Sequence, residues 1–163
     1  MSARGKLILA GGLFAFFAVT HGDPSLISHA TLDSAAAVPA GGSYTPYSWA
    51  TTFLAAIPEP VTGCNIGFVT AWEAAEGGNW NNAARYNPIN TTEREPGSWS
   101  MNSVGVQAYP SWQEGMQATV TTIRNGNYQG ILDALAAGDS AQAAANAVGA
   151  SPWGTGYFTA HCD

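Results

Sequence analysis

The chain has 163 residues, which is enough for one domain with an ordinary hydrophobic core and short appendages. It carries five basic residues against eleven acidic ones, a net charge of −6. This balance argues against nucleic acid as a partner, because binding to a polyanion depends largely on Lys and Arg contacts with phosphates.

The first 20 residues have the pattern of an export signal. Arg4 and Lys6 precede an apolar run over residues 7–20. A run of this length suits the core of a signal peptide better than a membrane-spanning helix, which needs about 20 residues. We therefore expect an exported or membrane-anchored protein. There are three alternatives for residues 1–20: they are cleaved off, they are retained as a membrane anchor, or they pack against other subunits, as in a virion. Residues 21–45, rich in Ala, Ser, Gly and Pro, are expected to form a linker or extended arm.

The remaining residues, 46–163, are expected to form one α+β domain that is mostly helical. Apolar residues at helical spacing, together with caps and glycine stops, predict five helices. The expected helices cover residues 47–57, 65–76, 111–124, 128–137 and 140–148. Ser111 and Glu114 have the spacing of a capping box at the start of the third helix. Residues 79–110 are rich in Asn, Pro and Gly, and 103–109 is the best strand candidate, which predicts a small β-hairpin region.

The two cysteines, Cys64 and Cys162, lie far apart in the sequence. A disulfide between them would tie the C-terminal tail to the start of the second helix and would suit an exported protein. By the chain-entropy model, a loop of that size contributes up to about 4–5 kcal/mol. Two free thiols are the alternative. Neither cysteine has a His or Cys neighbour at zinc-ligand spacing, so we expect no metal site and no cofactor.

A carboxylate stands at the end of the second predicted helix. At 3.6 residues per turn, Val69, Trp72 and Glu76 share one face, so Glu76 points along the apolar side. Gly77 and Gly78 follow as a stop signal, because glycine adopts the left-handed conformation without a Cβ clash. Burial and the negative end of the helix dipole would both disfavour the charged form, which is the property that a general acid requires. The alternative is a surface glutamate at a frayed helix end.

Five short motifs occur in an order that resembles the lysozyme-like superfamily, which includes goose-type lysozymes, lytic transglycosylases and the lysozyme-like modules of actinobacterial phages and their hosts. The motifs are Glu-Gly-Gly (76–78), Asn-Pro-Ile-Asn-Thr-Thr (87–92), Gly-Val-Gln (105–107), Tyr-Pro-Ser-Trp (109–112) and Ala-Ser-Pro-Trp-Gly-Thr-Gly (150–156). The first replaces a Glu-Ser-Gly-like motif of the family, and the third is one residue shorter than its family counterpart. The resemblance covers roughly residues 46–156 and implies a lysozyme-like helical domain whose β-hairpin borders the active-site groove.

The resemblance implies cleavage of the β-1,4 bond between the amino sugars of peptidoglycan, with Glu76 protonating the leaving oxygen. A glycosidase usually needs a second carboxylate, about 5 Å away if retaining or about 6.5–9.5 Å away if inverting. Glu93, Glu95 and Glu73 are the candidates, and Glu93 is preferred because it faces Glu76 across a turn in the expected layout. Lytic transglycosylases work with a single glutamate, so hydrolase and transglycosylase both stay open, with the hydrolase preferred.

Polar and aromatic residues near the expected groove are candidates for binding the sugars. These candidates are Asn90, Thr91, Thr92, Gln107, Tyr109 and Trp99. The Asn and the two Thr offer donors and acceptors, with local turn capping as the alternative. Gln107 and Tyr109 could orient the sugar or a water. Trp80 and Trp99 lie in loops and suit stacking on sugars, whereas Trp153 is either a stacking platform or a plug that closes the helical part of the domain.

The expected partner is therefore the glycan strand of the bacterial cell wall. A non-catalytic virion structural or wall-binding protein with the same fold is the first alternative, because a fold does not fix a function. A signal-anchored phage endolysin would reconcile the N-terminal segment with enzymatic activity.

Overall fold

The computed structural model describes residues 43–77, 80 and 83–163, so the expected signal segment and most of the expected arm lie outside the described residues. The described part contains five helices and one two-stranded antiparallel sheet, which confirms a mostly helical α+β domain. The helices are α2 (Pro46–Ala56), α3 (Gly63–Ala75), α4 (Trp112–Ile123), α5 (Gln129–Ala137) and α6 (Ala141–Gly149). The strands are β1 (Trp99–Ser100) and β2 (Gln107–Ala108). No helix in these described ranges is long and apolar enough to span a bilayer.

The helix boundaries follow the capping signals of the sequence, and each agrees with its prediction to within two residues. Ser111 is the N-cap of α4, and its hydroxyl oxygen accepts a hydrogen bond from the Glu114 backbone N–H. Gly138 ends α5 in the left-handed conformation, and Ser140 caps α6. The expected strand over 103–109 is shorter than predicted, because only Gln107–Ala108 pairs with β1.

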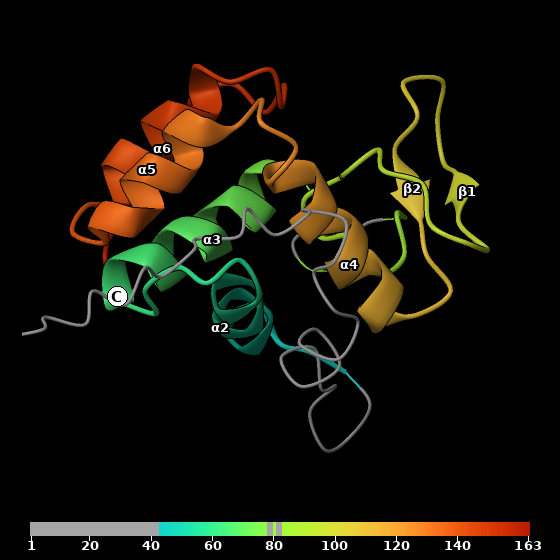
Figure 1. Ribbon diagram of the computed structural model, residues 1–163, viewed down its shortest axis with the longest axis horizontal. Coiled ribbons are helices and arrows are strands. Elements are labelled where there is room, and N and C mark those ends of the chain that lie inside the picture. Colours follow the sequence, from blue (N-terminus) through green and yellow to red (C-terminus); the bar gives the residue numbers. More distant parts are fainter. Residues whose placement is uncertain (1–42, 78–79, 81–82) are drawn as a thin grey trace, which may run out of the picture.

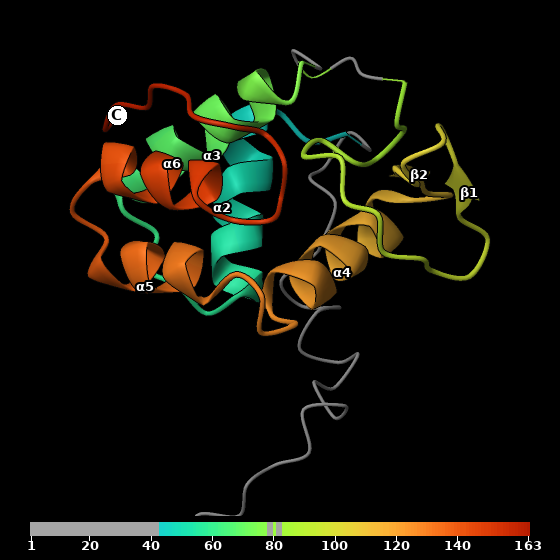
Figure 2. The same cartoon turned by 90° about the horizontal axis from the view of Figure 1, so that it is seen from above.

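Helix α3 lies at the centre of the helical lobe, which we define as α2, α3, α5 and α6. It packs against α2 and α6, and α5 packs against α6 (Figures 1 and 2). Helix α4, residues 83–110 and the sheet form the hairpin lobe beside it. Apolar residues of α4, including Met116 and Val120, belong to the same buried core as the aromatic residues of α2 and α3. One continuous core therefore joins the two lobes.

The boundary of the expected arm lies slightly earlier than the sequence predicts. Tyr44 is 3 % exposed and its ring contacts the ring of Trp112 edge-on, with 5.4 Å between centroids. Thr45 is the N-cap of α2 and forms a capping box with Ser48. The last two residues of the expected arm thus belong to the domain.

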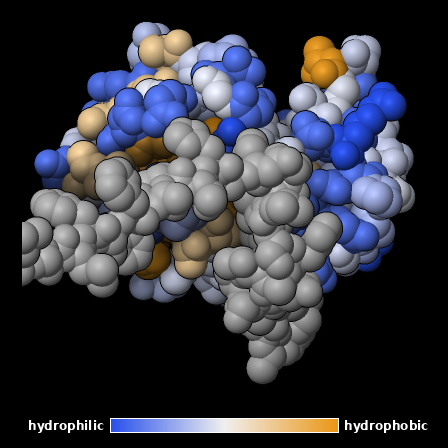
Figure 3. Space-filling view, in the orientation of Figure 1, coloured by the Kyte–Doolittle hydropathy of each residue, from blue (hydrophilic) through white to orange (hydrophobic). Residues whose placement is uncertain are grey.

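The hairpin carries exposed apolar side chains. Trp99 and Val104 are 46 % and 75 % exposed, and Met101 is also exposed. In the space-filling view the described surface is largely hydrophilic (Figure 3). An apolar group stands at its upper edge, on the same side as the hairpin in Figure 1. Nearly half of the surface of Trp99 is therefore accessible to solvent.

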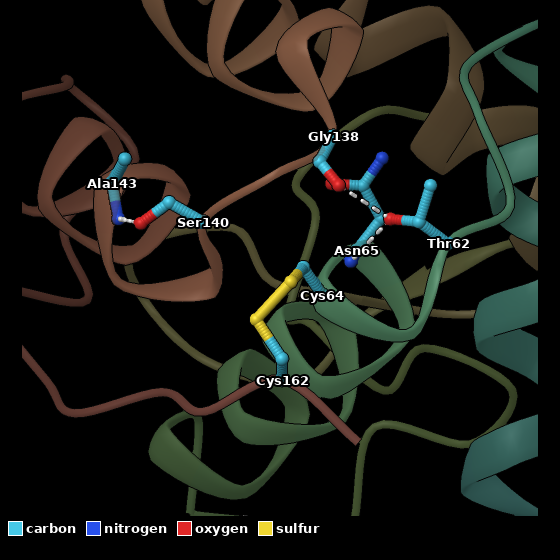
Figure 4. Close-up of a disulfide and its surroundings, with 7 residues drawn as sticks. All are labelled: Thr62, Cys64, Asn65, Gly138, Ser140, Ala143 and Cys162. Atoms are coloured by element: carbon cyan, nitrogen blue, oxygen red, sulfur yellow. Dashed lines mark hydrogen bonds between the residues drawn. A yellow bond between two sulfur atoms is a disulfide. The ribbon is translucent and has the colours of Figure 1, made fainter.

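A disulfide joins Cys64 in the first turn of α3 to Cys162 in the C-terminal tail, as the sequence predicts (Figure 4). The tail lies directly on α3, since a Cβ added to Gly67 would stand 2.0 Å from the carbonyl oxygen of His161. Only glycine permits this approach. The disulfide and the close packing together hold the tail against the first half of α3, at the end opposite Glu76.

Candidate functional site

Glu76 occupies the C-cap position of α3, at the end that points towards the hairpin lobe (Figure 1). Val69 and Trp72 on the same face are fully buried, and Glu76 is half-buried. Gly77 follows with a φ of 81°, the left-handed conformation that terminates the helix. These positions confirm the predicted face and the predicted helix stop, while Gly78 lies outside the described residues.

Both carboxylate oxygens of Glu76 accept hydrogen bonds from residues that are distant in sequence. The side-chain nitrogen of Asn90 donates to Oε2 at 2.9 Å and also to the backbone carbonyl oxygen of Glu76 at 3.1 Å. The hydroxyl of Thr155 donates to Oε1. The carboxylate is therefore held in one orientation by two side chains from different segments.

The segment that carries Thr155 is fixed to the core by two tryptophans. The indole N–H of Trp72 donates to Thr155 Oγ1 at 3.1 Å. The ring of Trp153 packs edge-on against Trp72, with 4.7 Å between ring centroids, and also contacts Tyr128. The indole N–H of Trp153 donates to the carbonyl oxygen of Ile89 at 3.0 Å. Trp153 thus fills the junction between the C-terminal segment and residues 87–91, which is the plug role considered from the sequence.

Asn90 is positioned by a turn that Asn87 organises. The buried Asn87 side chain accepts from the Thr91 backbone N–H at 2.9 Å and donates to the carbonyl oxygens of Thr91 and Gln107 at 2.8 and 2.7 Å. The backbone of Asn90 adopts a φ of 57°, a left-handed conformation that Asn tolerates better than most residues. The Asn-Pro-Ile-Asn-Thr-Thr motif therefore forms a rigid turn whose fourth residue reaches Glu76.

Three predicted sugar-binding residues are buried. Thr91 is 2 % exposed, and its hydroxyl shares a hydrogen bond with that of Thr122. Gln107, also 2 % exposed, bonds to Ser98, Ser100 and the Gly105 carbonyl within the hairpin. These side chains support the hairpin lobe from inside, which corrects the prediction that they bind the sugar in the groove.

Tyr109 is the third buried member of that set. It is fully buried, and its hydroxyl donates to the carbonyl oxygen of Glu93 at 2.6 Å. Burial, with a smaller contribution from the charges of Glu95 and Glu93, raises the pKa of Tyr109 far above its usual value near 10. Tyr109 is thus a structural donor and not a surface group, whereas Thr92 and Trp99 are exposed as a ligand contact would require.

The three candidates for a second carboxylate differ in their burial and in their hydrogen bonds. Glu73 is 4 % exposed and accepts a hydrogen bond from the Trp80 backbone N–H at 2.5 Å. Burial raises the pKa of Glu73 above its usual value, and this hydrogen bond offsets part of that rise. Glu93 and Glu95 are half-buried, and their backbone N–H groups donate to Thr91 Oγ1 at 3.4 Å and to Ser98 Oγ at 3.2 Å. The hairpin lobe thus fixes the backbone at Glu93 and Glu95.

Sequence reasoning missed Thr155 as a site residue. It belongs to the quoted motif at 150–156, but no local spacing connects it to Glu76, which is 79 positions away. Comparison with protein-family models, with curated proteins and with solved structures finds no match for this chain. Function is therefore inferred from the geometry around Glu76 and from the order of the motifs.

Proposed function

We propose that this protein is a peptidoglycan glycosidase of the lysozyme-like superfamily, with Glu76 as the general acid. One observation carries the proposal. Three of the motifs that resemble this superfamily meet at a single carboxylate, because Asn90 of 87–92 and Thr155 of 150–156 both hydrogen-bond to Glu76. A half-buried carboxylate that is held in one orientation at a helix end supports this role, because a general acid must be positioned before it transfers its proton.

In the proposed reaction, Glu76 gives its proton to the oxygen of the β-1,4 bond. The bond between this oxygen and the anomeric carbon breaks, and its electron pair stays with the departing oxygen. The anomeric carbon then bonds to a water molecule, which loses a proton to a carboxylate. Glu93 is the proposed second carboxylate, either as the base for this water or as the stabiliser of the oxocarbenium-like centre.

A lytic transglycosylase is the second candidate, and the burial of Thr91 favours it. In a hydrolase, Thr91 would be a polar partner for the attacking water beside Glu93, but its hydroxyl bonds to that of Thr122 in the interior. In a transglycosylase, Glu76 acts first as acid and then as base, and a hydroxyl of the substrate closes the 1,6-anhydro ring. Neither a water nor Glu93 is then needed.

The exposed Trp99 of β1 supplies a stacking surface for the glycan in either reaction. The exposed Thr92 supplies a polar group nearby in sequence. The sparse positive charge of the chain, five Lys and Arg residues in all, suits an uncharged sugar better than a polyanion.

The test is clearance of a peptidoglycan suspension by the purified full-length chain and its Glu76→Gln variant. We expect the variant to lose about a hundredfold or more of the rate, while its circular dichroism stays native. Glu59→Gln is the matched control, because Glu59 is half-buried in the segment between α2 and α3, before the end of α3 that is opposite Glu76, and should keep wild-type activity. Equal rates for wild type and Glu76→Gln would refute Glu76 as the acid. A folded but inactive wild type would favour the structural or wall-binding alternative.

A further inference from the structure

We propose that Thr155 is a positioning residue that holds Glu76 in both of its protonation states and assigns the acidic proton to Oε1. The catalytic consequence rests on the proposed function, whereas the assignment of the proton stands on the hydrogen-bond geometry alone. The key contacts are the Thr155 hydroxyl at Oε1, the Trp72 indole behind it, and the Asn90 amide at Oε2.

The partner of Oε2 can act only as a donor. The Asn90 side-chain atom that contacts Oε2 also contacts the backbone carbonyl oxygen of Glu76, and a carbonyl oxygen can only accept. This atom must therefore be the amide nitrogen. A proton on Oε2 could not be shared with this amide, which has no lone pair to receive it. The carbonyl oxygen of a neutral carboxyl is also a better acceptor than its hydroxyl oxygen, so the Asn90 contact favours Oε2 without a proton.

The partner of Oε1, the Thr155 hydroxyl, can act as a donor or as an acceptor. A threonine hydroxyl has one hydrogen to donate and two lone pairs that accept. The Trp72 indole, which is a donor only, occupies one lone pair of Thr155 Oγ1. One hydrogen and one lone pair remain for Glu76. The hydroxyl can thus donate to an ionised Oε1, and after rotation it can accept from a protonated Oε1.

This difference between the two partners decides where the proton resides. Glu76 can gain or lose a proton at Oε1 and keep both hydrogen bonds, whereas a proton on Oε2 would weaken the acceptor to which the Asn90 amide donates. In the proposed reaction the proton on Oε1 turns away from Thr155 towards the glycosidic oxygen and is transferred to it. The Thr155 hydroxyl then turns to donate its own hydrogen to the new carboxylate. Thr155 would then stabilise the charge that develops on Glu76 as the bond breaks.

The first test compares Thr155→Val, which keeps the shape but removes the hydroxyl, with Thr155→Ser, which keeps the hydroxyl. We expect Thr155→Val to lower kcat about tenfold or more with little change in KM, and Thr155→Ser to restore most of the rate. Thr159→Val, at an exposed position of the same tail, is the matched control and should behave as wild type. Full activity in Thr155→Val, or an equal loss in Thr155→Ser, would overturn the proposal.

The second test needs no activity. The NMR resonance of the Trp72 indole N–H, assigned by Trp72→Phe, should shift with pH together with the Glu76 carboxyl resonance in wild type and in Thr155→Ser. The shift should vanish in Thr155→Val and in Glu76→Gln. The Glu76→Gln variant shows that the shift reports the ionisation of Glu76 and not that of Glu73 on the same helix. An indole resonance that ignores the ionisation of Glu76 in the wild type would overturn the proposal. If the wild type cleaves no glycan, the proposed function fails, and this measurement still decides the role of Thr155.

Discussion

One side-chain nitrogen of Asn90 reaches two oxygens of Glu76, the backbone carbonyl at 3.1 Å and carboxylate Oε2 at 2.9 Å. The first contact satisfies a carbonyl at the open end of α3, and the second orients the carboxylate. A single amide therefore caps the helix and fixes the proposed acid. Loss of this amide should affect stability and activity together.

A comparison of Asn90→Gly with Asn90→Ala separates the role of the Asn90 amide from the role of the left-handed backbone conformation at this position. Both variants remove the contact with Glu76, so we expect both to lose about tenfold or more of the glycan-cleaving rate. Asn90 has a φ of 57°, which glycine adopts freely and alanine adopts at a cost of about 1–2 kcal/mol. Urea unfolding should therefore show Asn90→Ala to be less stable than Asn90→Gly by about that amount. Full activity in Asn90→Gly would show that the amide does not orient the acid.

The reaction products decide between hydrolysis and transglycosylation. If Glu93 is the second carboxylate, digested glycan should carry ordinary reducing ends, and Glu93→Gln should lose about tenfold or more of the rate. Glu95→Gln is the neighbouring control and should remain active. Mass spectra distinguish reducing products from 1,6-anhydro products by one water. Predominantly anhydro products, with full activity in the Glu93→Gln, Glu95→Gln double variant, would identify a transglycosylase.

The close approach of the C-terminal tail to α3 predicts opposite effects for two Gly→Ala substitutions. A Cβ at Gly67 would stand 2.0 Å from the His161 carbonyl oxygen, so Gly67→Ala must displace the tail and should destabilise the fold by about 1–3 kcal/mol or more. Gly130, near the start of α5, has no heavy atom within 4 Å of the same position. Gly130→Ala should be neutral or stabilising by up to about 1 kcal/mol. Urea denaturation of both variants measures the difference, and similar free energies of unfolding would contradict the packing of the tail.

The raised pKa of Glu73 predicts that the stability of the fold depends on pH. Burial raises its pKa above the ordinary value of 4.5, and the hydrogen bond from the Trp80 N–H lowers the pKa only in part. Between pH 4.5 and the folded pKa, the folded state binds more protons than the unfolded state, so stability falls as pH rises through this window. Glu73→Gln cannot ionise, and its amide oxygen can still accept from Trp80. The free energy of unfolding of Glu73→Gln relative to wild type should therefore be higher at pH 7 than at pH 4. A difference that is the same at both pH values would show that burial does not perturb Glu73.

The sequence alone determined the helices, because caps, glycine stops and the apolar period are local signals. Ser111 with Glu114, and Gly138 before Ser140, mark helix ends to within two residues. The same local reasoning placed Glu76 at the end of α3 on its apolar face. The disulfide also followed from the sequence, because two cysteines in a chain with an export-like start leave few alternatives.

Only the tertiary structure decided which side chains surround Glu76 and which are buried. Thr155 reaches Glu76 across 79 positions of sequence, along a path set by Trp153 and Trp72 in the core. Thr91 and Thr92 are adjacent and chemically alike, yet the first faces Thr122 in the interior and the second faces solvent. An irregular turn has no fixed period, so the direction of its side chains depends on the helix packed against it, and that packing leaves no local trace in the sequence.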